Sequence, residues 1–430
     1  MCVASFANAT IDGNVAVRGA RFVRMPDDRD PFDPEAQTLL HALTLRGAII
    51  TGSVQLVRSL CIGGCLLSYA RVEEDVWVQD CRLIAMEGQD AVEMQTASVG
   101  GIVGFCDSAA LGQHASTLHR LRSDFSVNVV LGRMHLLGLR ARYLWIDNIV
   151  QHAGGGSFGE PSANLLINTA ITITNAEISD SIWLGAYGGG ANPAHEAAIL
   201  GAIDLTSTKV GSSLQISYLG DVANGADAVP SLVPMESAFV RDRLGYASNY
   251  LPNFCVLNLQ NTVVGDGVTI DNCRLSAVGF QDIIWSSALR LEKGDVGRGL
   301  TIGANVELSG SLRLTSSRIG RSVKIECRSI DALRNNHAIP TAIDLSQLVV
   351  DGDVCIGAPA RQGIIGGMAA MTIRGAMRME DSRIASKLAI ARCEFTIDTL
   401  QYSASLRGAL GLSATAISYA PAFSGGVRAR

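Results

Sequence analysis

Residues 154–159 read Gly-Gly-Gly-Ser-Phe-Gly, which matches two motifs that carry chemistry. One is the G-x-G-x-x-G turn that binds dinucleotide phosphates, and the other is the G-x-S-x-G turn that presents a nucleophilic serine. Both need a strand before the turn and a helix after it. Here Glu160-Pro161-Ser162 and another apparent strand follow. The motif therefore indicates a glycine loop rather than a catalytic turn.

The spacing of possible metal ligands argues against a metal centre. Cys61 and Cys65 have no clustered histidine beside them in the sequence, and a structural zinc site needs four ligands. The histidines contain no H-E-x-x-H spacing. Asp28, Asp30 and Asp33 lack the glycine and the final glutamate of a calcium loop. We expect neither a metal nor another cofactor.

Four aspartates, Asp266, Asp271, Asp282 and Asp295, offer another route to catalysis. Enzymes built on β-helices usually place such groups on one outward face of neighbouring coils. Two carboxylates that meet there could hydrolyse a glycosidic bond. Solvated aspartates in turns are the simpler interpretation, and the sequence leaves open whether any two converge.

A repeat of eleven residues must position these side chains. Positions 1 and 3 of each unit are apolar and flank a polar-tolerant position 2, which is typical of a strand with one buried face. Position 8 is apolar as well, and position 6 is small, which indicates a tight interior corner. Four consecutive units carry these apolar residues at positions 1, 3 and 8: Leu43, Leu45, Ile50; Val54, Leu56, Cys61; Cys65, Leu67, Val72; Val76, Val78, Leu83.

A short fixed period predicts a solenoid. Eleven residues are too few to enclose a filled core, so we interpret each unit as half of a coil of about 22 residues. The fold class is therefore expected to be all-β, a parallel β-helix with coils about 4.8 Å apart. The handedness of parallel crossovers favours a right-handed coil.

The β-helix is expected to span residues 1–395, with a C-terminal cap or tail over 396–430. Loops on a rigid scaffold commonly carry function, and the largest insertion, residues 217–256, is the first choice for a binding surface. Its aromatic residues include Tyr246 and Tyr250, which could instead dock the loop onto the coils. Segments that break the period predict loop and short helical insertions near 23–42, 106–126, 153–162, 185–200, 217–256, 331–341 and 357–372.

Position 7 is often basic and, lying between two interior positions, should point outward. Stacked coils would turn such residues into interrupted basic stripes able to bind a polyanion, an acidic glycan or a partner. Alternatively, the arginine stems cover apolar surface and pair with acidic neighbours. The candidate binding residues are Arg71, Arg82, Arg274, Arg318, Arg383, Tyr246 and Tyr250.

Composition limits the partners and the location. The net charge of −5 gives no bulk attraction to nucleic acid, so we expect no nucleic-acid partner. No apolar run is long enough for a membrane helix, and the first residues lack the features of a secretory signal. Several of the ten cysteines occupy interior positions, which predicts free packing thiols in a reducing compartment. We therefore expect a cytoplasmic protein without a transmembrane segment.

The run from Leu43 to Leu56, Leu-Thr-Leu-Arg-Gly-Ala-Ile-Ile-Thr-Gly-Ser-Val-Gln-Leu, is echoed from Ile203 onward. It resembles the L-x-L-x-G-A-x-I-x-G-x-L-x-L repeats of a bacterial group of β-helix proteins often labelled membrane-associated oxidoreductase. It is also distantly similar to bactofilins, which are polymer-forming cytoskeletal β-helices. The resemblance covers most of the chain but consists of structural positions only. It implies the fold and transfers no functional residue.

These patterns favour a non-enzymatic β-solenoid scaffold or interaction protein that presents loops and a basic stripe to a protein partner. Two alternatives stay open. One is a carbohydrate-active β-helix enzyme, a glycan hydrolase or lyase, with its site beside the 217–256 insertion. The other is self-association into a filament, because bare solenoid ends invite strand pairing.

Overall fold

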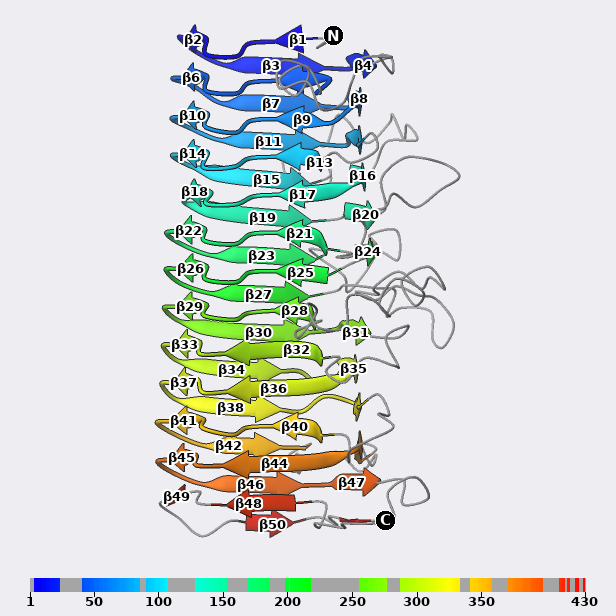
Figure 1. Ribbon diagram of the computed structural model, residues 1–430, viewed down its shortest axis with the longest axis vertical. Helices are drawn as coiled ribbons and strands as arrows, with labels where there is room; N and C mark the ends of the chain where they lie inside the picture. Colours follow the sequence, from blue (N-terminus) through cyan, green and yellow to red (C-terminus); the bar gives the residue numbers. More distant parts are fainter. Residues whose placement is uncertain are drawn as a thin grey trace, which may run out of the picture. The chain divides into compact units, whose positions relative to one another are not determined.

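The computed structural model describes residues 4–23, 41–85, 90–106, 128–147, 149–152, 169–185, 198–200, 202–217, 255–276, 287–332, 341–357 and 370–396, with four short strands between 410 and 429. All regular structure in these residues is β-strand. The chain divides into two units, Met1–Asp204 and Leu205–Arg430. Each unit is a parallel β-helix, which confirms the expected fold class (Figure 1). The expected loop insertions and the short helices expected within them fall largely outside the described residues.

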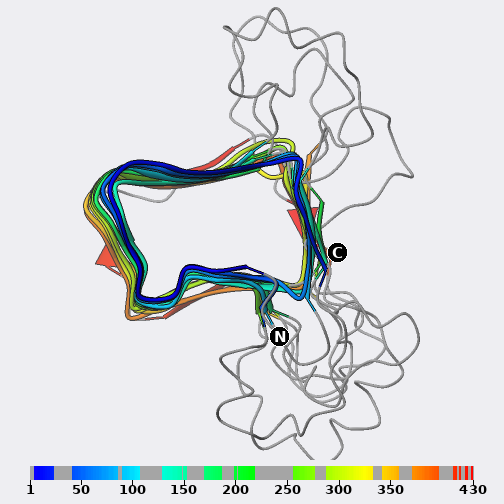
Figure 2. The ribbon, with the colours of Figure 1, turned by 90° about the horizontal axis from the view of Figure 1, so that it is seen from above.

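Unit 1 contains four parallel sheets within its described residues, and seen from above the coils trace a four-sided outline (Figure 2). In stacking order, sheet A1 contains β1 (Ala4–Ser5), β5 (Leu43–Thr44), β9 (Cys65–Leu66), β13 (Asp90–Glu93), β17 (Arg133–His135), β21 (Thr169–Thr172) and β25 (Ala202–Asp204). Sheet B1 contains β2 (Thr10–Ile11), β6 (Ile49–Ile50), β10 (Arg71–Val72), β14 (Ser98–Val99), β18 (Arg140–Ala141) and β22 (Glu177–Ile178). Sheet C1 contains β3 (Val15–Arg18), β7 (Val54–Val57), β11 (Val76–Gln79), β15 (Ile102–Cys106), β19 (Tyr143–Asp147) and β23 (Ile182–Gly185). Sheet D1 contains β4 (Arg21–Val23), β8 (Leu60–Ile62), β12 (Arg82–Ile84), β16 (Asn128–Leu131), β20 (Ile149–His152) and β24 (Ala198–Leu200).

Unit 2 repeats this plan with its own four sheets among the described residues. Sheet A2 contains β28 (Cys255–Asn258), β32 (Ser287–Glu292), β36 (Ser311–Thr315), β40 (Thr341–Asp344), β44 (Ala376–Glu380) and β48 (Leu410–Ser413). Sheet B2 contains β26 (Lys209–Val210), β29 (Val263–Val264), β33 (Asp295–Val296), β37 (Arg318–Ile319), β41 (Val349–Val350), β45 (Arg383–Ile384) and β49 (Ala416–Ile417). Sheet C2 contains β27 (Leu214–Ser217), β30 (Gly267–Asp271), β34 (Gly299–Ile302), β38 (Ser322–Ile325), β42 (Val354–Ile356), β46 (Leu388–Ala391) and β50 (Ala422–Ser424). Sheet D2 contains β31 (Arg274–Ser276), β35 (Glu307–Ser309), β39 (Ser329–Asp331), β43 (Met371–Arg374), β47 (Cys393–Thr396) and β51 (Arg428–Ala429). Strands β48–β51, which lie in the segment expected to form a cap or tail, thus pair with the preceding coil.

The strand register explains the eleven-residue repeat. Leu43 on β5 pairs with Cys65 on β9, and Val54 on β7 pairs with Val76 on β11, so one coil separates residues 22 apart. The first half-coil forms an A strand and a B strand, and the second forms a C strand and a D strand. The interpretation of two eleven-residue halves per coil is therefore confirmed.

The core consists of positions 1, 3 and 8, as the pattern predicts. Leu45 at position 3 and Ile50 and Leu83 at position 8 are each at most 1% exposed. Phe395 is the buried residue at position 8 of the half-coil that starts at Leu388. The exception is the half-coil that starts at Val15. Its positions 3 and 8 are part-exposed, because among the described strands β3 and β4 pair on one side only.

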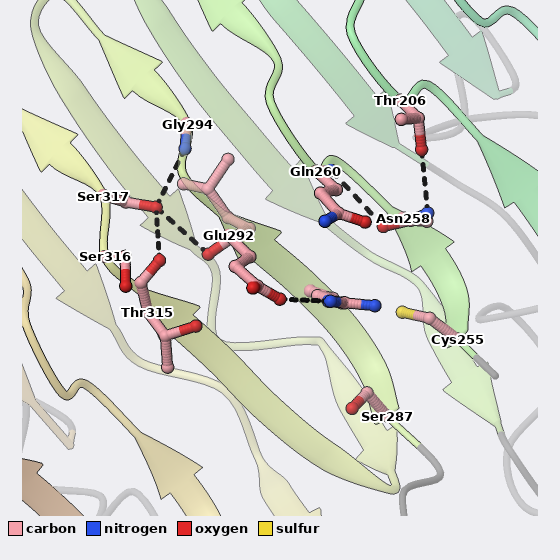
Figure 3. Close-up of polar contacts among 12 residues, drawn as sticks. Thr206, Cys255, Asn258, Gln260, Ser287, Glu292, Gly294, Thr315, Ser316 and Ser317 are labelled. Atoms are coloured by element: carbon pink, nitrogen blue, oxygen red, sulfur yellow. Dashed lines mark hydrogen bonds and ion pairs between the residues drawn. The ribbon is translucent and has the colours of Figure 1, made fainter. Parts of the chain in front are cut away.

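Most half-coils contain a left-handed residue at the corner, a feature that the repeat pattern alone did not predict. Position 5 has a positive φ in most half-coils, for example 52° at Asp80 and 54° at Asn175. Asparagine, aspartate and glycine tolerate this conformation best, so their enrichment at position 5 was a readable signal. The small residue at position 6 then turns inward. At one such corner the Ser317 hydroxyl accepts the Gly294 N–H at 3.1 Å and donates to the Thr315 carbonyl at 3.0 Å (Figure 3).

One corner departs from the expected register. In the half-coil that starts at Val323, position 6 is Arg328, which is exposed, and Cys327 is buried instead. The large arginine cannot enter the interior corner, so the preceding small thiol takes that place. The Arg328 guanidinium instead lies 3.2 Å from the Glu307 carboxylate on the surface.

Asn128 closes a corner of unit 1 at the point where the chain returns from residues outside the described part. It is fully buried. It occupies the same register position as Cys81 of the previous coil, because the next residues, Val129 and Arg82, are strand partners. Its amide oxygen accepts the Cys81 N–H at 2.8 Å, and its amide nitrogen donates to the carbonyls of Val78 at 3.1 Å and Cys106 at 2.8 Å. One side chain thus satisfies three buried main-chain groups.

A column of glycines lines the turns that follow sheet B2. Gly211, Gly265, Gly297 and Gly320 stack in successive coils, and each of the last three approaches the carbonyl oxygen of the glycine before it. A Cβ built on Gly297 would lie 2.1 Å from the Gly265 oxygen. Glycine is required here because neighbouring backbones leave no room for a side chain.

The cysteines of the described residues are free, and all except Cys355 are buried. Burial raises the pKa of the Cys81 thiol to about 12 and that of Cys393 to about 11. Burial also raises the pKa of Cys273 and Cys327. These thiols therefore pack as apolar groups, as their interior positions predict.

We expect Cys355 to be the first cysteine to react with a thiol reagent when the protein is folded. The test uses a Cys2→Ser variant, because Cys2 lies outside the described residues. The Cys355 side chain is part-exposed, whereas the buried thiols need local opening before a reagent reaches them. Mass spectrometry after brief labelling with iodoacetamide would locate the modified residue. Equal labelling of Cys81 and Cys355 under native conditions would contradict the expectation.

Candidate functional site: a tryptophan row on sheet C1

Three tryptophans share one register position on the outer face of sheet C1. Trp77 on β11 pairs with Gly104 on β15, Gly104 pairs with Trp145 on β19, and Trp145 pairs with Trp183 on β23. Strands β11, β15, β19 and β23 are direct neighbours in the stack (Figure 1). We call Trp77, Trp145 and Trp183 the tryptophan row.

Gly104 makes the row continuous although it carries no side chain. A Cβ at Gly104 would lie 2.2 Å from Cζ3 of Trp77, so the indole of Trp77 covers the glycine. The ring of Trp77 reaches that of Trp145 with a centroid distance of 6.3 Å and an interplanar angle of 69°. This is the edge-to-face geometry that aromatic pairs favour. A larger residue at 104 would separate the two indoles.

The row is held in place and remains accessible. The Nε1–H of Trp77 donates to Asp75 Oδ2 at 3.3 Å, and Asp75 Oδ1 accepts the Ile102 N–H at 2.7 Å. The three tryptophans are each part-exposed. The Trp77 indole, which also packs against Trp145, is therefore held in place before any ligand arrives, which lowers the entropic cost of binding.

Polar and apolar neighbours extend the tryptophan row. Gln55 on β7 pairs with Trp77, and Gln79 follows two residues later on the same face. On the other side of the row, Tyr143 precedes Trp145 on the same face of β19 and pairs with Ile102. The surface thus combines large aromatic faces with amide groups that can donate and accept hydrogen bonds. It suits a ligand that has both apolar faces and hydroxyl groups.

The structure disperses the basic residues that the sequence analysis singled out. In unit 1, Arg71 lies on sheet B1 and Arg82 on sheet D1. In unit 2, Arg274 lies on sheet D2, whereas Arg318 and Arg383 lie on sheet B2.

No two of these five are register partners within the described strands. Arg71 lies between Ile49 and Ser98, and Val349 separates Arg318 from Arg383.

Several of these arginines have a carboxylate beside them. Arg274 Nη2 lies 2.9 Å from the Glu307 carboxylate, and Arg318 Nη2 lies 3.0 Å from Asp351. Such exposed pairs contribute little to stability, but they offset the positive charge of the surface.

The remaining candidates do not gather into a site within the described residues. Tyr246, Tyr250 and Asp282 lie outside those residues. Asp266 lies 2.7 Å from the Arg298 guanidinium, and Asp271 accepts the Asn272 N–H at 2.9 Å.

On sheet A2, polar side chains also pair with one another. Asn258 donates to Thr206 at 2.9 Å (Figure 3), and Arg378 contacts Glu380 two residues along its strand at 2.5 Å. Each of these four side chains therefore has a polar partner beside it.

In unit 1, a polar cluster lies on the outer face of sheet A1. Asp90 accepts from Arg133 Nε at 2.6 Å and lies 3.1 Å from Nδ1 of His135. Glu93, on the strand beside His135, accepts the Ser68 hydroxyl at 2.9 Å. Burial disfavours the ionised form of Asp90, but the hydrogen bonds from His135 and Arg133 outweigh it, so the pKa of Asp90 is below its ordinary value. The cluster anchors three coils to one another.

We expect an Asp90→Asn variant to lose more stability at neutral pH than in acid. The folded state lowers the pKa of Asp90, so the stabilisation is present above about pH 4 and is lost as the pH falls through the folded pKa. Urea unfolding of both proteins at pH 7 and near pH 3 would measure the difference. A gap that stays constant or widens in acid would contradict the assignment.

Comparison of the chain with protein-family models, with curated proteins and with solved structures finds no match in any of the three. Within the described residues, no helix is long and apolar enough to cross a membrane. The same residues contain no group of three or more His, Cys, Asp or Glu side chains placed to hold a metal ion.

Proposed function

We propose that this protein is a non-catalytic β-solenoid scaffold that binds glycans through the tryptophan row. The observation that carries the proposal is the register of Trp77, Trp145 and Trp183 on one outer face. Isolated exposed aromatics are common on protein surfaces, but a row of part-exposed indoles on neighbouring strands is a typical mark of a binding site.

Glycans fit this surface for a chemical reason. A pyranose ring has an apolar C–H face that packs on an indole, while its hydroxyls remain free to bond to side chains. Gln55 and Gln79 lie beside Trp77 and carry amide donors and acceptors, and the Gln55 oxygen also accepts a hydrogen bond from Arg18 at 3.4 Å. The tryptophan row thus offers both kinds of contact that a sugar needs.

The carboxylate beside the tryptophan row supports binding rather than hydrolysis. Glycosidases use a pair of carboxyl groups that flank the scissile bond. Asp75 uses one oxygen for the Trp77 indole and the other for the Ile102 N–H. Its role is therefore to position the indole.

A glycan array followed by calorimetry tests the proposal. We expect the wild-type protein to bind at least one glycan, and Trp145→Ala to weaken that binding about fivefold or more. Stacking of a nucleic-acid base on one aromatic side chain contributes roughly 1–3 kcal/mol, and we expect a sugar face stacked on an indole to contribute a similar amount. Gly104→Ala should also weaken binding, because the new Cβ displaces the Trp77 indole without removing an aromatic ring.

The matched control is Tyr69→Ala. Tyr69 is 50% exposed at a corner of unit 1 and is not part of the row, so its loss should leave the affinity unchanged. The proposal fails if the wild-type protein binds no glycan, or if Trp145→Ala and Tyr69→Ala have equal effects. Circular dichroism of each variant verifies that the fold is retained.

A further inference from the structure

We infer that the ligand of the tryptophan row is a single, extended, neutral glycan chain that runs along the stacking direction of the coils. The inference rests on the proposed function, and it adds the class and the orientation of the ligand. Three features of the row support it, namely its direction, its spacing and the angle between its rings.

The direction of the row follows from the register. The aromatic side chains continue from strand to strand, from Trp77 over Gly104 to Trp145 and Trp183. Along a single strand the aromatic surface is shorter: on β19 it covers Tyr143 and Trp145, and on β23 Trp183 is followed at the next outward position by Gly185. A long ligand therefore gains most contact when it crosses the strands and follows the coil axis.

The spacing matches the repeat of a sugar chain. The ring centroids of Trp77 and Trp145 lie 6.3 Å apart, because Trp77 leans over Gly104. Trp145 and Trp183 stand on adjacent strands, which lie about 4.8 Å apart, and both separations are near the length of one pyranose residue in an extended glycan. The three rings therefore span roughly 11 Å, which a chain of about three to four sugar residues would occupy fully. Chains that curve, such as those with axial linkages, would leave the row after one or two contacts.

The angle between the rings selects a single chain over a flat surface. The planes of Trp77 and Trp145 differ by 69°, so both rings cannot lie face-down on one plane, as a crystalline polysaccharide would require. A single chain can turn between successive residues and contact the face of one ring and the edge of the next. The Asp75 side chain beside Trp77 adds an acidic group to this surface, which disfavours uronic acids, so a neutral chain fits better.

Calorimetry with a length series tests the inference. The probes are cello-oligosaccharides from glucose to cellohexaose, which are neutral and extended, and malto-oligosaccharides of equal length, which curve. We expect affinity to rise at least tenfold from the disaccharide to about the tetrasaccharide and then to level off, with malto-oligosaccharides binding at least tenfold more weakly. Crystalline cellulose should retain little of the protein in a sedimentation assay.

Trp183→Ala supplies the positional control, because Trp183 lies at one end of the row. We expect it to weaken the binding of the longest probes at least fivefold more than the binding of the disaccharide, and Trp183→Phe should restore part of that loss. Affinity that does not depend on length, equal binding of both series, or an equal loss at every length would overturn the inference. If the array shows other glycans bound at the tryptophan row but cello-oligosaccharides fail, the inference is wrong and the proposed function stands. If no glycan binds, the proposed function fails.

Discussion

Replacing Asn128 with alanine is expected to destabilise unit 1 by on the order of 4 kcal/mol. The side chain is fully buried and bonds to the N–H of Cys81 and to the carbonyls of Val78 and Cys106. Alanine leaves these three buried groups without their partner, and each such loss costs roughly 1–3 kcal/mol. The loss is large because one amide joins the main chain of two successive coils at a corner.

Urea unfolding followed by circular dichroism measures this effect. Thr262→Val is the matched control, because Thr262 is also fully buried at a position 6 but makes one hydrogen bond, from its hydroxyl to the Leu205 carbonyl at 2.9 Å. The control should cost about 1 kcal/mol. The interpretation of Asn128 is wrong if its alanine variant is no less stable than Thr262→Val.

Gly297→Ala is expected to destabilise unit 2 by about 3 kcal/mol, at the upper end of the usual cost of overpacking. The added methyl would lie 2.1 Å from the Gly265 oxygen and 2.9 Å from the Gly265 carbonyl carbon. Both are main-chain atoms held in a ladder, and the Gly297 N–H itself donates to the Val264 carbonyl at 2.8 Å. Relief of the clash requires two coils to move apart.

The control for this prediction is Gly267→Ala. Gly267 lies two residues after Gly265 and is the first residue of β30. A Cβ there meets its nearest atom, the Gly299 oxygen, at 3.2 Å, which a small shift can accommodate. We expect it to cost less than half as much as Gly297→Ala when both are measured by thermal and urea unfolding. A cost for Gly297→Ala no larger than that for Gly267→Ala would contradict the interpretation that the glycine column leaves no room for a methyl group.

The fold was readable from the sequence because stacking enforces a strict pattern. Each coil repeats the same strands at the same places, so side chains such as Leu45 and Leu83 must be apolar at a fixed period. The left-handed corner residue at position 5 was not recognised, although Asn175 and Asn272 carry its signature. Arg328 shows the limit of the pattern, because a shift of one residue places Cys327 in the corner instead.

The tryptophan row could not be predicted in the same way, because the spacing of its members along the chain is irregular. Trp77, Trp145 and Trp183 occupy the same register position, yet neither interval is a whole number of 22-residue coils. Segments of different length enter between the coils, and only the pairing of strands restores the alignment. The readable part of the signal is that Trp77 and Trp183 each follow the first apolar position of a recognisable half-coil.

The chain order of the strands has a consequence for engineering. In every coil the path from an A strand through B to C is short, whereas the long interruptions come after a C strand or after a D strand. At one such interruption the Cys106 carbonyl and the Asn128 amide, on either side of residues 107–127, are hydrogen-bonded at 2.8 Å. The two ends of the interruption are therefore fixed at a short separation by the frame itself, and the entropy of closing a loop grows only slowly with its length. Foreign peptides or whole domains with adjacent termini can be transplanted at these points, which makes the chain a display frame with graft sites in successive coils.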